Sequence, residues 1–398
     1  MNAAPQIKGW CPSAWRPMLT GDGYLMRLRF SCGILSSEQG RAIATLAQCY
    51  GNGLIDLTRR ANLQIRGVAE DGIEELQREL LARNLIAPDT QGVDAPNVIA
   101  SPLAGRDRAA LLDIRPLVRE LEQRLASEPD VRDLPAKFCI AVEDGGRFSL
   151  KHIRANIAFE AGQQDGQIRF AVRVDALSLA DLVFPTQLVD VVLELIGAPQ
   201  PWDSGSHSAS LHARDDVIAA ENAVDLIADD VFGVAAPFGS LKADQLALLA
   251  ELADGHAEGE LRLTTRRSVL IPAIASGANE QIEDECARAG LITEPSDPRR
   301  HVAACTGAPG CTSASVATRD IAASLASLLP RHDTLHVSGC AKSCASSAAA
   351  SVTLVGRDGR FDLVRNGKAG DAPLLFGLSA AEARAAVQRI AAEELAHV

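Results

Sequence analysis

The sequence predicts an α/β fold made of two similar halves related by a pseudo-twofold axis, each half built from ferredoxin-like α/β units with a mixed sheet. One observation is that strand-like alternation is followed by a helical period of apolar residues, twice in succession near the start of the chain. A second is that the chain resembles itself after a shift of 206 residues. A third is a pair of cysteine motifs in the last quarter, which predicts a domain organised around a metal centre.

The internal repeat is the most specific of these observations. Over 33 positions aligned without a gap, beginning at Gly33 and ending at Ile65, eleven residues are identical to those 206 positions later. The matches include a shared Leu-Thr-x-Arg, at Leu57–Arg60 and Leu263–Arg266. Chance similarity between two amphipathic units is the alternative, and the shared motif argues against it. We therefore predict an internal duplication.

The individual elements follow from local patterns. Tyr24–Phe30 alternates and predicts a strand that carries Arg27 and Arg29 on one face. Ser36–Cys49 has a helical apolar period, and Ser36 or Ser37 can cap its start. Further along the first half we expect a strand region at Leu54–Val68, a helix at Gly72–Arg83, a loop at Asp94–Gly105, a helix at Arg108–Ser127, strands at Lys137–Val142, Phe148–Ile157 and Gln167–Val174, and a helix at Pro185–Ile196. In the second half we expect a helix at Thr318–Leu329, a hairpin at Val352–Val364 that turns at Asp358-Gly359, and a closing helix at Ser379–Leu395.

These elements divide the chain into five segments. Proline, serine, glycine and histidine gather at 199–209, which is the composition of a linker. We expect an N-terminal arm and first ferredoxin-like half-domain at 1–90, a further α/β domain at 91–200, the linker at 201–220, a second ferredoxin-like half-domain at 221–298 and an iron–sulfur cluster domain at 299–398.

Composition and charge exclude several classes of function. The net charge of −12 and the pI near 5.2 argue against binding to nucleic acid or to an anionic membrane surface. The longest apolar stretches carry charges and are shorter than the ~18 residues that a membrane span requires. The nine cysteines are odd in number, and the chain starts without a secretory pattern, so disulfides are not expected. We expect a cytoplasmic protein.

Four of the cysteines form two closely spaced pairs. Five residues separate Cys305 from Cys311, and three separate Cys340 from Cys344. Four thiolates from two loops can hold a [4Fe–4S] cluster, and the neighbouring glycine and proline allow sharp turns around it. A structural zinc site is the first alternative, although zinc pairs are usually spaced more tightly. Buried free thiols are the second, and they have no reason to occur as two pairs.

Basic residues cluster at a few places in this acidic chain. Arginine binds carboxylates through two parallel hydrogen bonds, so such a set favours a ligand with several carboxylates. Salt bridges to neighbouring acids are the simpler interpretation for any single arginine. The basic set, with two neutral residues that can add donors, comprises Arg27, Arg29, Arg59, Arg60, Arg66, Lys137, Lys151, Arg154, Arg262, Arg266 and Arg267, with Asn62 and Gln64.

Histidines and glycine motifs are less informative. His152, His301, His332 and His336 are possible metal ligands, but each is more often a surface or core residue. No glycine-rich dinucleotide motif follows a predicted strand, so we do not expect NAD(P)H to be held in a Rossmann unit.

The motifs together resemble those of the sulfite/nitrite reductase superfamily over essentially the whole chain. That family has two repeats and a C-x5-C…C-x3-C cluster motif. It also has a Thr-x-Arg-x-x-x-Gln strand that contacts a tetrapyrrole, here Thr58, Arg60 and Gln64. An Asn-Val-x-x-x-Pro loop begins here at Asn97, and a Leu-Pro-x-Lys-Phe strand contains Lys137. The resemblance implies a duplicated sulfite/nitrite reductase-like fold, α/β or α+β in class, with a [4Fe–4S] cluster.

The departures from the family pattern concern its oxyanion site. Sulfite and nitrite reductases resemble one another in having arginine where this chain has Pro96, and basic residues where it has Ala136 and Cys139. Without those cations a small dianion over sirohaem iron would lack partners, which is costly when it is buried. The chain therefore looks like a family member that keeps the seat for a macrocycle and lacks the oxyanion site.

One branch of the superfamily, the precorrin-3B synthases of the aerobic cobalamin pathway, shares these features. The chain is similar to that branch at Gly9–Met18, at Leu134–Phe138 and at His336–Lys342. The resemblance implies a monooxygenase that uses O₂ to hydroxylate precorrin-3A at C20 with γ-lactone formation. It also implies a [4Fe–4S] cluster, a mononuclear non-haem iron, and NADH as the source of electrons, passed on by a reductase or other donor.

The resemblance also assigns roles to residues. Cys305, Cys311, Cys340 and Cys344 would hold the cluster, and His152 or His336, or groups of the substrate itself, would bind the non-haem iron. Substrate contacts are expected from Arg27, Arg29, Thr58, Arg60, Gln64, Asn97 and Lys137. The alternatives are a sirohaem- and [4Fe–4S]-dependent sulfite or nitrite reductase, and a non-catalytic tetrapyrrole-binding or electron-transfer protein.

Overall fold

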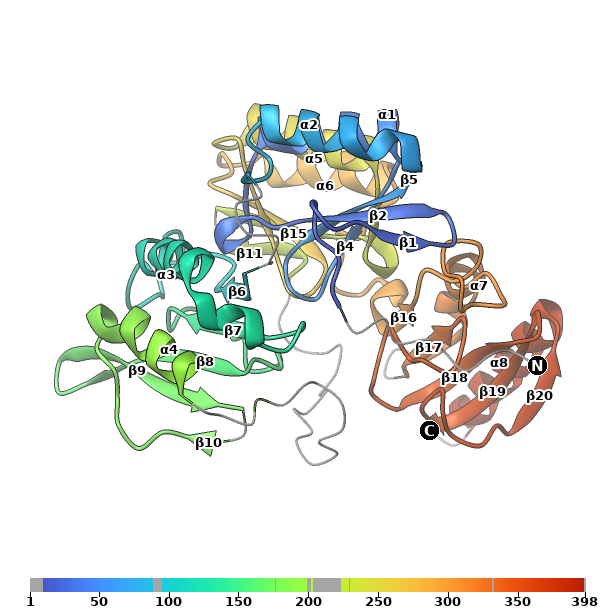
Figure 1. The fold of residues 1–398 in the computed structure, drawn as a ribbon. Helices are drawn as coiled ribbons and strands as arrows, with labels where there is room; N and C mark the ends of the chain where they lie inside the picture. The colour runs from blue at the N-terminus through green and yellow to red at the C-terminus, as the bar shows by residue number, and fades with distance from the viewer. Residues whose placement is uncertain are drawn as a thin grey trace.

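Four five-stranded sheets, each covered by helices, make up the computed structural model of this chain (Figure 1). The structure describes residues 10–88, 95–175, 177–198, 202, 223–228, 230–330 and 333–396. Apart from Trp202, the predicted linker at 201–220 lies outside the described residues. No helix in the described ranges is long and apolar enough to cross a membrane.

Two of the sheets form a central domain by exchanging strands. The first central sheet has the order β1-β2-β5-β4-β13 and the second the order β11-β12-β15-β14-β3, all antiparallel. Each half therefore supplies one edge strand to the sheet of the other half. The strands of the first sheet are β1 (Met18–Thr20), β2 (Gly23–Leu28), β5 (Leu63–Val68), β4 (Leu54–Leu57) and β13 (Ser240–Lys242). Those of the second are β11 (Asp225–Ala228), β12 (Val231–Ala235), β15 (Ser268–Pro272), β14 (Glu260–Leu263) and β3 (Ile34–Ser36).

Four helices cover the central sheets on one side, at the top of Figure 1. They are α1 (Ser37–Tyr50), α2 (Ile73–Ala82), α5 (Ala243–His256) and α6 (Asn279–Arg288). A capping box begins α1, because the Ser36 hydroxyl accepts from Gln39 N at 3.1 Å and Gln39 Oε1 accepts from Ser36 N at 3.0 Å. Gly40 lets α1 approach α5 closely, since a Cβ there would lie 3.3 Å from that of Ala250. One apolar core runs through both halves.

The backbone repeats the duplication predicted from the sequence. Both α1 with α5 and β4 with β14 are related by the same shift of 206 residues. We call two residues that the shift of 206 relates mates. Positive φ angles recur at mates, at Cys32 (54°) with Phe238 (56°) and at Ala61 (53°) with Arg267 (60°). Positive φ is unusual for residues with a Cβ, so its recurrence is independent support for the repeat.

Each half also has a satellite domain with one further sheet. In the first satellite (lower left in Figure 1) the order is β10-β9-β8-β7-β6, and in the second (lower right) it is β16-β17-β18-β19-β20. Both sheets have three parallel strands followed by two antiparallel ones. The first contains β6 (Asn97–Ala100), β7 (Cys139–Glu143), β8 (Ile157–Gln164), β9 (Gln167–Val174) and β10 (Leu177–Ser178), with α3 (Arg115–Ser127) and α4 (Leu188–Gly197). The second contains β16 (Val302–Ala304), β17 (Leu335–Ser338), β18 (Ala350–Arg357), β19 (Arg360–Gly367) and β20 (Leu375–Leu378), with α7 (Arg319–Leu325) and α8 (Ala380–Ala396).

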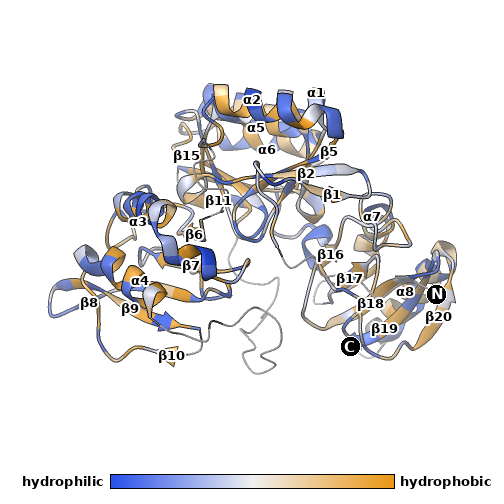
Figure 2. Ribbon diagram, in the orientation of Figure 1, coloured by the Kyte–Doolittle hydropathy of each residue, from blue (hydrophilic) through white to orange (hydrophobic). Residues whose placement is uncertain are grey.

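Figure 2 shows hydrophobic and hydrophilic stretches alternating along α2 and α3, as expected for amphipathic helices that cover a sheet. The helices bury Leu76 and Leu80 from α2, and Val118, Leu121 and Leu125 from α3.

Three local predictions were wrong. The predicted loop at 94–105 contains β6, a strand of four residues that is too short to show a period and is held by parallel pairing with β7. The predicted strand at 148–157 is a loop up to β8. Its alternation arises because Phe148, Leu150 and Ile153 are buried as the loop packs on the core. The helix expected from Arg108 begins at Arg115, where Asp113 accepts from the Arg115 amide at 3.0 Å.

Candidate functional site

The Thr-x-Arg motif forms the turn between β4 and β5. The Thr58 hydroxyl accepts from the amides of Arg60 (3.2 Å) and Asn62 (3.1 Å), and Ala61 occupies the left-handed region. Its mate Thr264 closes the equivalent turn in the second half in the same way. The structure therefore gives Thr58 a role in shaping the turn that presents Arg60. A direct contact between Thr58 and a substrate stays a prediction.

A cavity of about 850 Å³ lies beside this turn, between the first central sheet and the first satellite. We call it the first cavity. The described residues that line it include five arginines and no aspartate or glutamate, although the chain has a net charge of −12. The five are Arg16, Arg27, Arg29, Arg60 and Arg132.

Arg27 is a half-buried cation in this cavity. With its amide oxygen toward Arg27, Gln64 accepts from Nε at 3.1 Å and from Nη2 at 2.9 Å across the β2–β5 pair. Burial lowers the pKa of Arg27; the nearby Cys11 opposes this shift, and Arg29 and Arg60 add to it. Repulsion among guanidinium groups in a desolvated space is relieved by an anionic ligand.

The first satellite closes the other side of the cavity. Asn62 Nδ2 donates to Asn97 Oδ1 at 2.9 Å, and Arg60 Nη2 donates to the Lys137 carbonyl at 2.7 Å. Arg29 donates to the Ala95 carbonyl. Of the seven residues predicted to contact substrate, Arg27, Arg29, Arg60 and Asn97 line the cavity, while Thr58, Gln64 and Lys137 adjoin it.

The N-terminal arm contributes residues that sequence reasoning did not assign to the site. Trp10, Cys11 and Trp15 line the cavity, and the guanidinium of Arg16 lies 4.3 Å from the centre of the Trp10 ring. The two tryptophans and Cys11 in an aperiodic segment were the available signal, but nothing in the segment indicated which surface it would cover.

Two arginines of the predicted basic set have structural partners instead. Arg66 is 4% exposed and pairs with Asp22 at 2.8 Å and Asp56 at 3.3 Å. Arg262 is fully buried, pairs with Glu260 at 2.8 Å, and donates to the Ala104 carbonyl at 3.1 Å. These two arginines hold domains together, as the simpler interpretation of salt bridges supposed.

The four predicted cluster cysteines lie on two loops of the second satellite that pack directly on each other. Gly339 N donates to Cys305 Sγ at 3.2 Å, and Ser315 N donates to the Gly339 carbonyl at 3.1 Å. Partial burial raises the pKa of Cys340 and of Cys344, and the other cysteines of the set raise it further. Thiols that influence one another in this way are close together, and bound iron favours their thiolate forms.

The spacing of these thiols differs from that around one ion. Among the described residues no three His, Cys, Asp or Glu side chains converge as the ligands of one metal ion do. A four-iron cluster is larger, so its four thiolates stand further apart than the ligands of one ion. Assignment of a cluster to these four cysteines stays a prediction. The described residues also contain no group of three such side chains that could hold a mononuclear iron. Of the histidines considered above as metal ligands, His152, His301 and His336 lie in the described residues, and His332 lies outside them.

An ion network attaches the first cysteine loop to the central domain. Arg66 Nη2 donates to the Gly310 carbonyl at 2.7 Å, and Asp56, on the other side of Arg66, pairs with Arg319 at 2.8 Å. Gly21 packs against the same loop, because a Cβ there would lie 2.0 Å from the Pro309 carbonyl oxygen. The network fixes the first cysteine loop relative to the sheet that carries Arg27 and Arg60.

Two family models match the chain over more than half of its length. The nitrite/sulfite reductase ferredoxin-like half domain matches residues 16–83 and 229–289, and the nitrite and sulphite reductase 4Fe-4S domain matches residues 92–176. The chain belongs to the sulfite/nitrite reductase superfamily. The two half-domain matches correspond to the two halves of the central domain.

Individual relatives in the superfamily are named for different activities. A precorrin-3B synthase from Sinorhizobium sp. is 28% identical and aligns with 96% of this chain and 89% of its own length. A ferredoxin–nitrite reductase from Synechococcus elongatus is 29% identical over 91% of this chain and 83% of its own length. The structure of the Mycobacterium tuberculosis NirA protein has the same fold, with a TM-score of 0.69 at 20% identity, covering 92% of this chain and 80% of that one.

The position of the cysteines within the superfamily fold is informative. The 4Fe-4S domain model matches the first satellite, where Cys139 is the only cysteine and is fully buried. The two cysteine pairs are in the second satellite, which has the same strand order. Only the second satellite therefore contains the four cysteines that are predicted to hold a cluster.

Proposed function

We propose that this protein is a precorrin-3B synthase, which hydroxylates precorrin-3A at C20 with O₂ and forms a γ-lactone. The observation that carries the proposal is the first cavity, which combines five arginines, no acidic residue among those described, and a volume of about 850 Å³. Precorrin-3A bears acetate and propionate side chains around a large ring. A polycarboxylate of that size matches both the charge and the volume of the cavity.

Neutral residues at the cavity wall favour this reaction over sulfite or nitrite reduction. Pro96 and Ala136 line the first cavity where sulfite and nitrite reductases resemble one another in having cations. Cys139, at the third such position, is fully buried, and burial raises its pKa to about 11, so it is uncharged at neutral pH. Arg27 and Arg60, which face a macrocycle in the proposed arrangement, are retained.

The chain's own groups bind and orient the substrate in this proposal. Arg27, fixed by Gln64, and Arg60, fixed by the Lys137 carbonyl, would hold carboxylates on one edge of the ring. Trp10 and Trp15 of the arm would cover the site and exclude water. Insertion of one oxygen atom of O₂ with reduction of the other to water requires two electrons and two protons. A [4Fe–4S] cluster, when bound, supplies electrons singly from a donor that draws on NADH.

The first experiment is the absorption spectrum of protein purified without air, together with iron and acid-labile sulfide counts. We expect a broad cluster band without the bands of a chlorin-type macrocycle. An O₂-dependent assay on precorrin-3A should then give one hydroxylated product per O₂ consumed. Arg60→Ala should weaken binding of the macrocycle with the cluster intact, whereas Arg78→Ala, an exposed pair with Glu75, should not.

A sirohaem-dependent nitrite or sulfite reductase is the second candidate. The observation in its favour is that the nitrite reductase from Synechococcus elongatus is as similar to this chain as the precorrin-3B synthase. Strong sirohaem bands in the purified protein, with reduction of nitrite by a chemical electron donor, would establish it. Cluster bands without either activity would instead indicate the electron-transfer or tetrapyrrole-binding alternative.

A further inference from the structure

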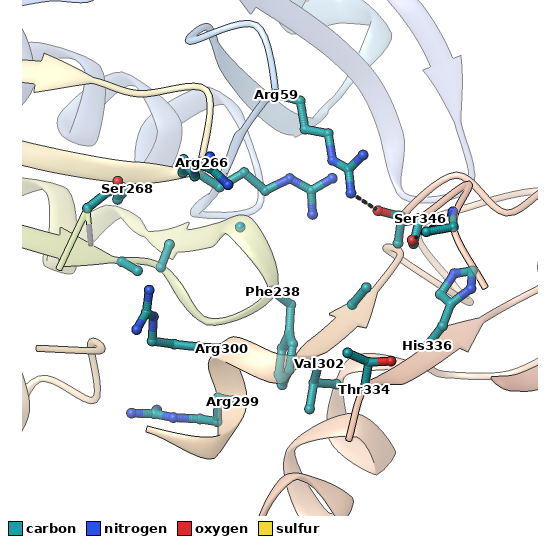
Figure 3. A pocket seen from close by; sticks show the side chains of 18 of the residues that line it. Arg59, Phe238, Arg266, Ser268, Arg299, Arg300, Val302, Thr334, His336 and Ser346 are labelled. Carbon is teal, nitrogen blue, oxygen red and sulfur yellow. Dashed lines mark hydrogen bonds between the residues drawn. The ribbon is translucent and has the colours of Figure 1, made fainter. Parts of the chain in front are cut away.

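A second cavity lies at the position that the duplication relates to the first. It has a volume of about 290 Å³ and is bounded by the second central sheet, the second satellite and the loop that carries His152. Its lining includes Arg266, Ser268 and Ile292, which are the mates of Arg60, Asn62 and Ile86. Figure 3 shows Arg59 and Arg266 reaching into the space from the central domain, with His336 on the opposite wall.

This cavity is also basic. The described residues that line it include five arginines and two histidines, and no aspartate or glutamate. Burial is the main cause that lowers the pKa of Arg300 and of His152, and the charge of Arg266 adds to it in both. For Arg300 the charge of Asp297 opposes the shift. Burial, with repulsion from Arg59, also lowers the pKa of Arg267 to about 10. A second set of mutually repelling cations is thus desolvated here, separate from the first.

Some of these groups already have partners. Arg299 pairs with Asp297 at 2.6 Å, Arg300 donates to the Pro295 carbonyl at 2.6 Å, and Arg59 donates to the Ala345 carbonyl at 3.0 Å. These contacts fix the cavity wall. Of these three partners only Asp297 is charged, and it is not among the described residues that line the cavity.

His336 is different because its ring nitrogens have no hydrogen-bond partner among the described residues. It lies on β17, is 1% exposed, and neither ring nitrogen makes a hydrogen bond within the described part of the chain. Arg267 Nε is likewise buried and makes no hydrogen bond to any residue that the structure describes. Leaving a buried donor or acceptor unsatisfied costs about 1–3 kcal/mol, so native proteins rarely retain such groups without a ligand or water.

We propose that the second cavity is an anion site distinct from the first, which takes a compact group with two or more carboxylate or phosphate-type oxygens. Its volume is about a third of that of the first cavity, which excludes a whole macrocycle. Arginine side chains bind such oxygens bidentately, and an imidazole can add one further hydrogen bond. The occupant is either a free small dianion or a carboxylate side chain of a macrocycle seated over the intervening turn.

The test is a reciprocal comparison of the duplicated arginines in the full-length protein loaded with its cluster. Binding of succinate and of inorganic phosphate is measured by calorimetry at constant ionic strength in the wild type and in Arg266→Ala, His336→Leu, Arg60→Ala and Arg78→Ala. We expect Arg266→Ala and His336→Leu to weaken anion binding by about tenfold or more, the effect of one hydrogen bond to a charged group. Arg60→Ala reports any binding of the same anions in the first cavity. Arg78→Ala, which removes an exposed arginine that lines neither cavity, is the control and should change anion binding by less than about twofold.

Macrocycle affinity is measured in the same variants to identify the source of the anion. If neither free anion binds but both Arg60→Ala and Arg266→Ala weaken the macrocycle, the cavity takes one of its carboxylates. If Arg266→Ala and His336→Leu change neither the binding of free anions nor that of the macrocycle, the second site is refuted. If every variant binds the macrocycle like the wild type, and only Arg266→Ala and His336→Leu lose anion binding, then the proposed substrate is refuted and this site stands.

Discussion

At the scale of single residues, the arginines of this protein fall into two kinds that their sequence neighbourhoods do not distinguish. Arg66 and Arg262 are buried against carboxylates and carbonyls, and they join domains. Arg27 and Arg60 are held by neutral acceptors, Gln64 and the Lys137 carbonyl, and they face a cavity. A cation oriented by neutral groups keeps its charge available for a ligand. The second kind is therefore where anion binding should be sought.

The cluster assignment depends on four thiols, and Cys340 is the most direct one to remove. Its loop packs on Gly307 and Ala314 of the first cysteine loop through Gly339. Cys340→Ser should abolish the cluster, because serine replaces a thiolate ligand of iron. The measurement is iron and sulfide content after purification without air. Cys49→Ser, at an exposed cysteine outside the two pairs, is the control and should retain full content.

The buried His336 should also make the stability of the protein depend on pH. Burial, with repulsion from Arg59, lowers its pKa from 6.5 to about 4. The unfolded chain therefore binds the proton first, so the stability contributed by neutral His336 is complete above pH 6.5 and is lost as pH falls toward 4. Thermal unfolding of the apoprotein should show this loss relative to His336→Leu. Equal pH dependence in the two proteins would contradict the burial of a neutral imidazole.

Other groups also contribute to the pH dependence of stability, and some of their contributions oppose that of His336. The comparison with His336→Leu is needed to separate them. His152 has its pKa lowered to about 4, mainly by burial and then by Arg266, and adds a loss in the same direction. Glu143 has its pKa raised to about 7, mainly by burial, so its contribution is lost as pH rises from 4.5 through 7.

At the scale of elements, the two Thr-x-Arg turns should have equal structural roles and different functional ones. Thr58→Ala and Thr264→Ala each remove a hydroxyl that accepts from two backbone amides. Each should lower the free energy of unfolding by about 1–3 kcal/mol. Thr58→Ala should also weaken macrocycle binding, because its turn presents Arg60 to the first cavity. Thr264→Ala should instead weaken binding at the second cavity, because its turn presents Arg266 there. Denaturant titration and a binding assay on both variants separate the two effects.

The ion pairs of Arg66 connect the first cysteine loop to the first central sheet, and they can also be tested at the scale of elements. Burial opposes ionisation of Asp22, but the hydrogen bond and charge of Arg66 lower its pKa below the ordinary value. Arg66→Ala would leave Asp22 and Asp56 without this partner and release the Gly310 carbonyl. We expect a loss of about 3 kcal/mol in unfolding free energy and faster loss of the cluster under a chelator. Arg83→Ala breaks an exposed pair with Glu79 and should cost less than about 0.5 kcal/mol.

At the scale of the whole molecule, the duplication and most helices could be predicted from the sequence because they depend on local patterns. The capping box at Ser36 and the hairpin turn at Asp358-Gly359 are examples. The exchange of β3 and β13 could not, because pairing between strands more than 180 residues apart leaves no local signal in either strand. The second cavity was missed for a related reason. Arg266 and His336 are 70 residues apart and meet only through the packing of two domains.

Strand exchange leads to a prediction about the two halves. In the structure β13 completes the first central sheet by pairing with β4, β3 completes the second by pairing with β14, and α1 packs on α5. Residues 1–200 or 221–398 alone would expose both a sheet edge and the apolar core that now runs through both halves. Neither fragment should unfold cooperatively by circular dichroism, whereas the two produced together should associate and bind the cluster. A fragment that folds cooperatively alone would mean that the exchanged strand is dispensable, and that each half carries a sufficient core of its own.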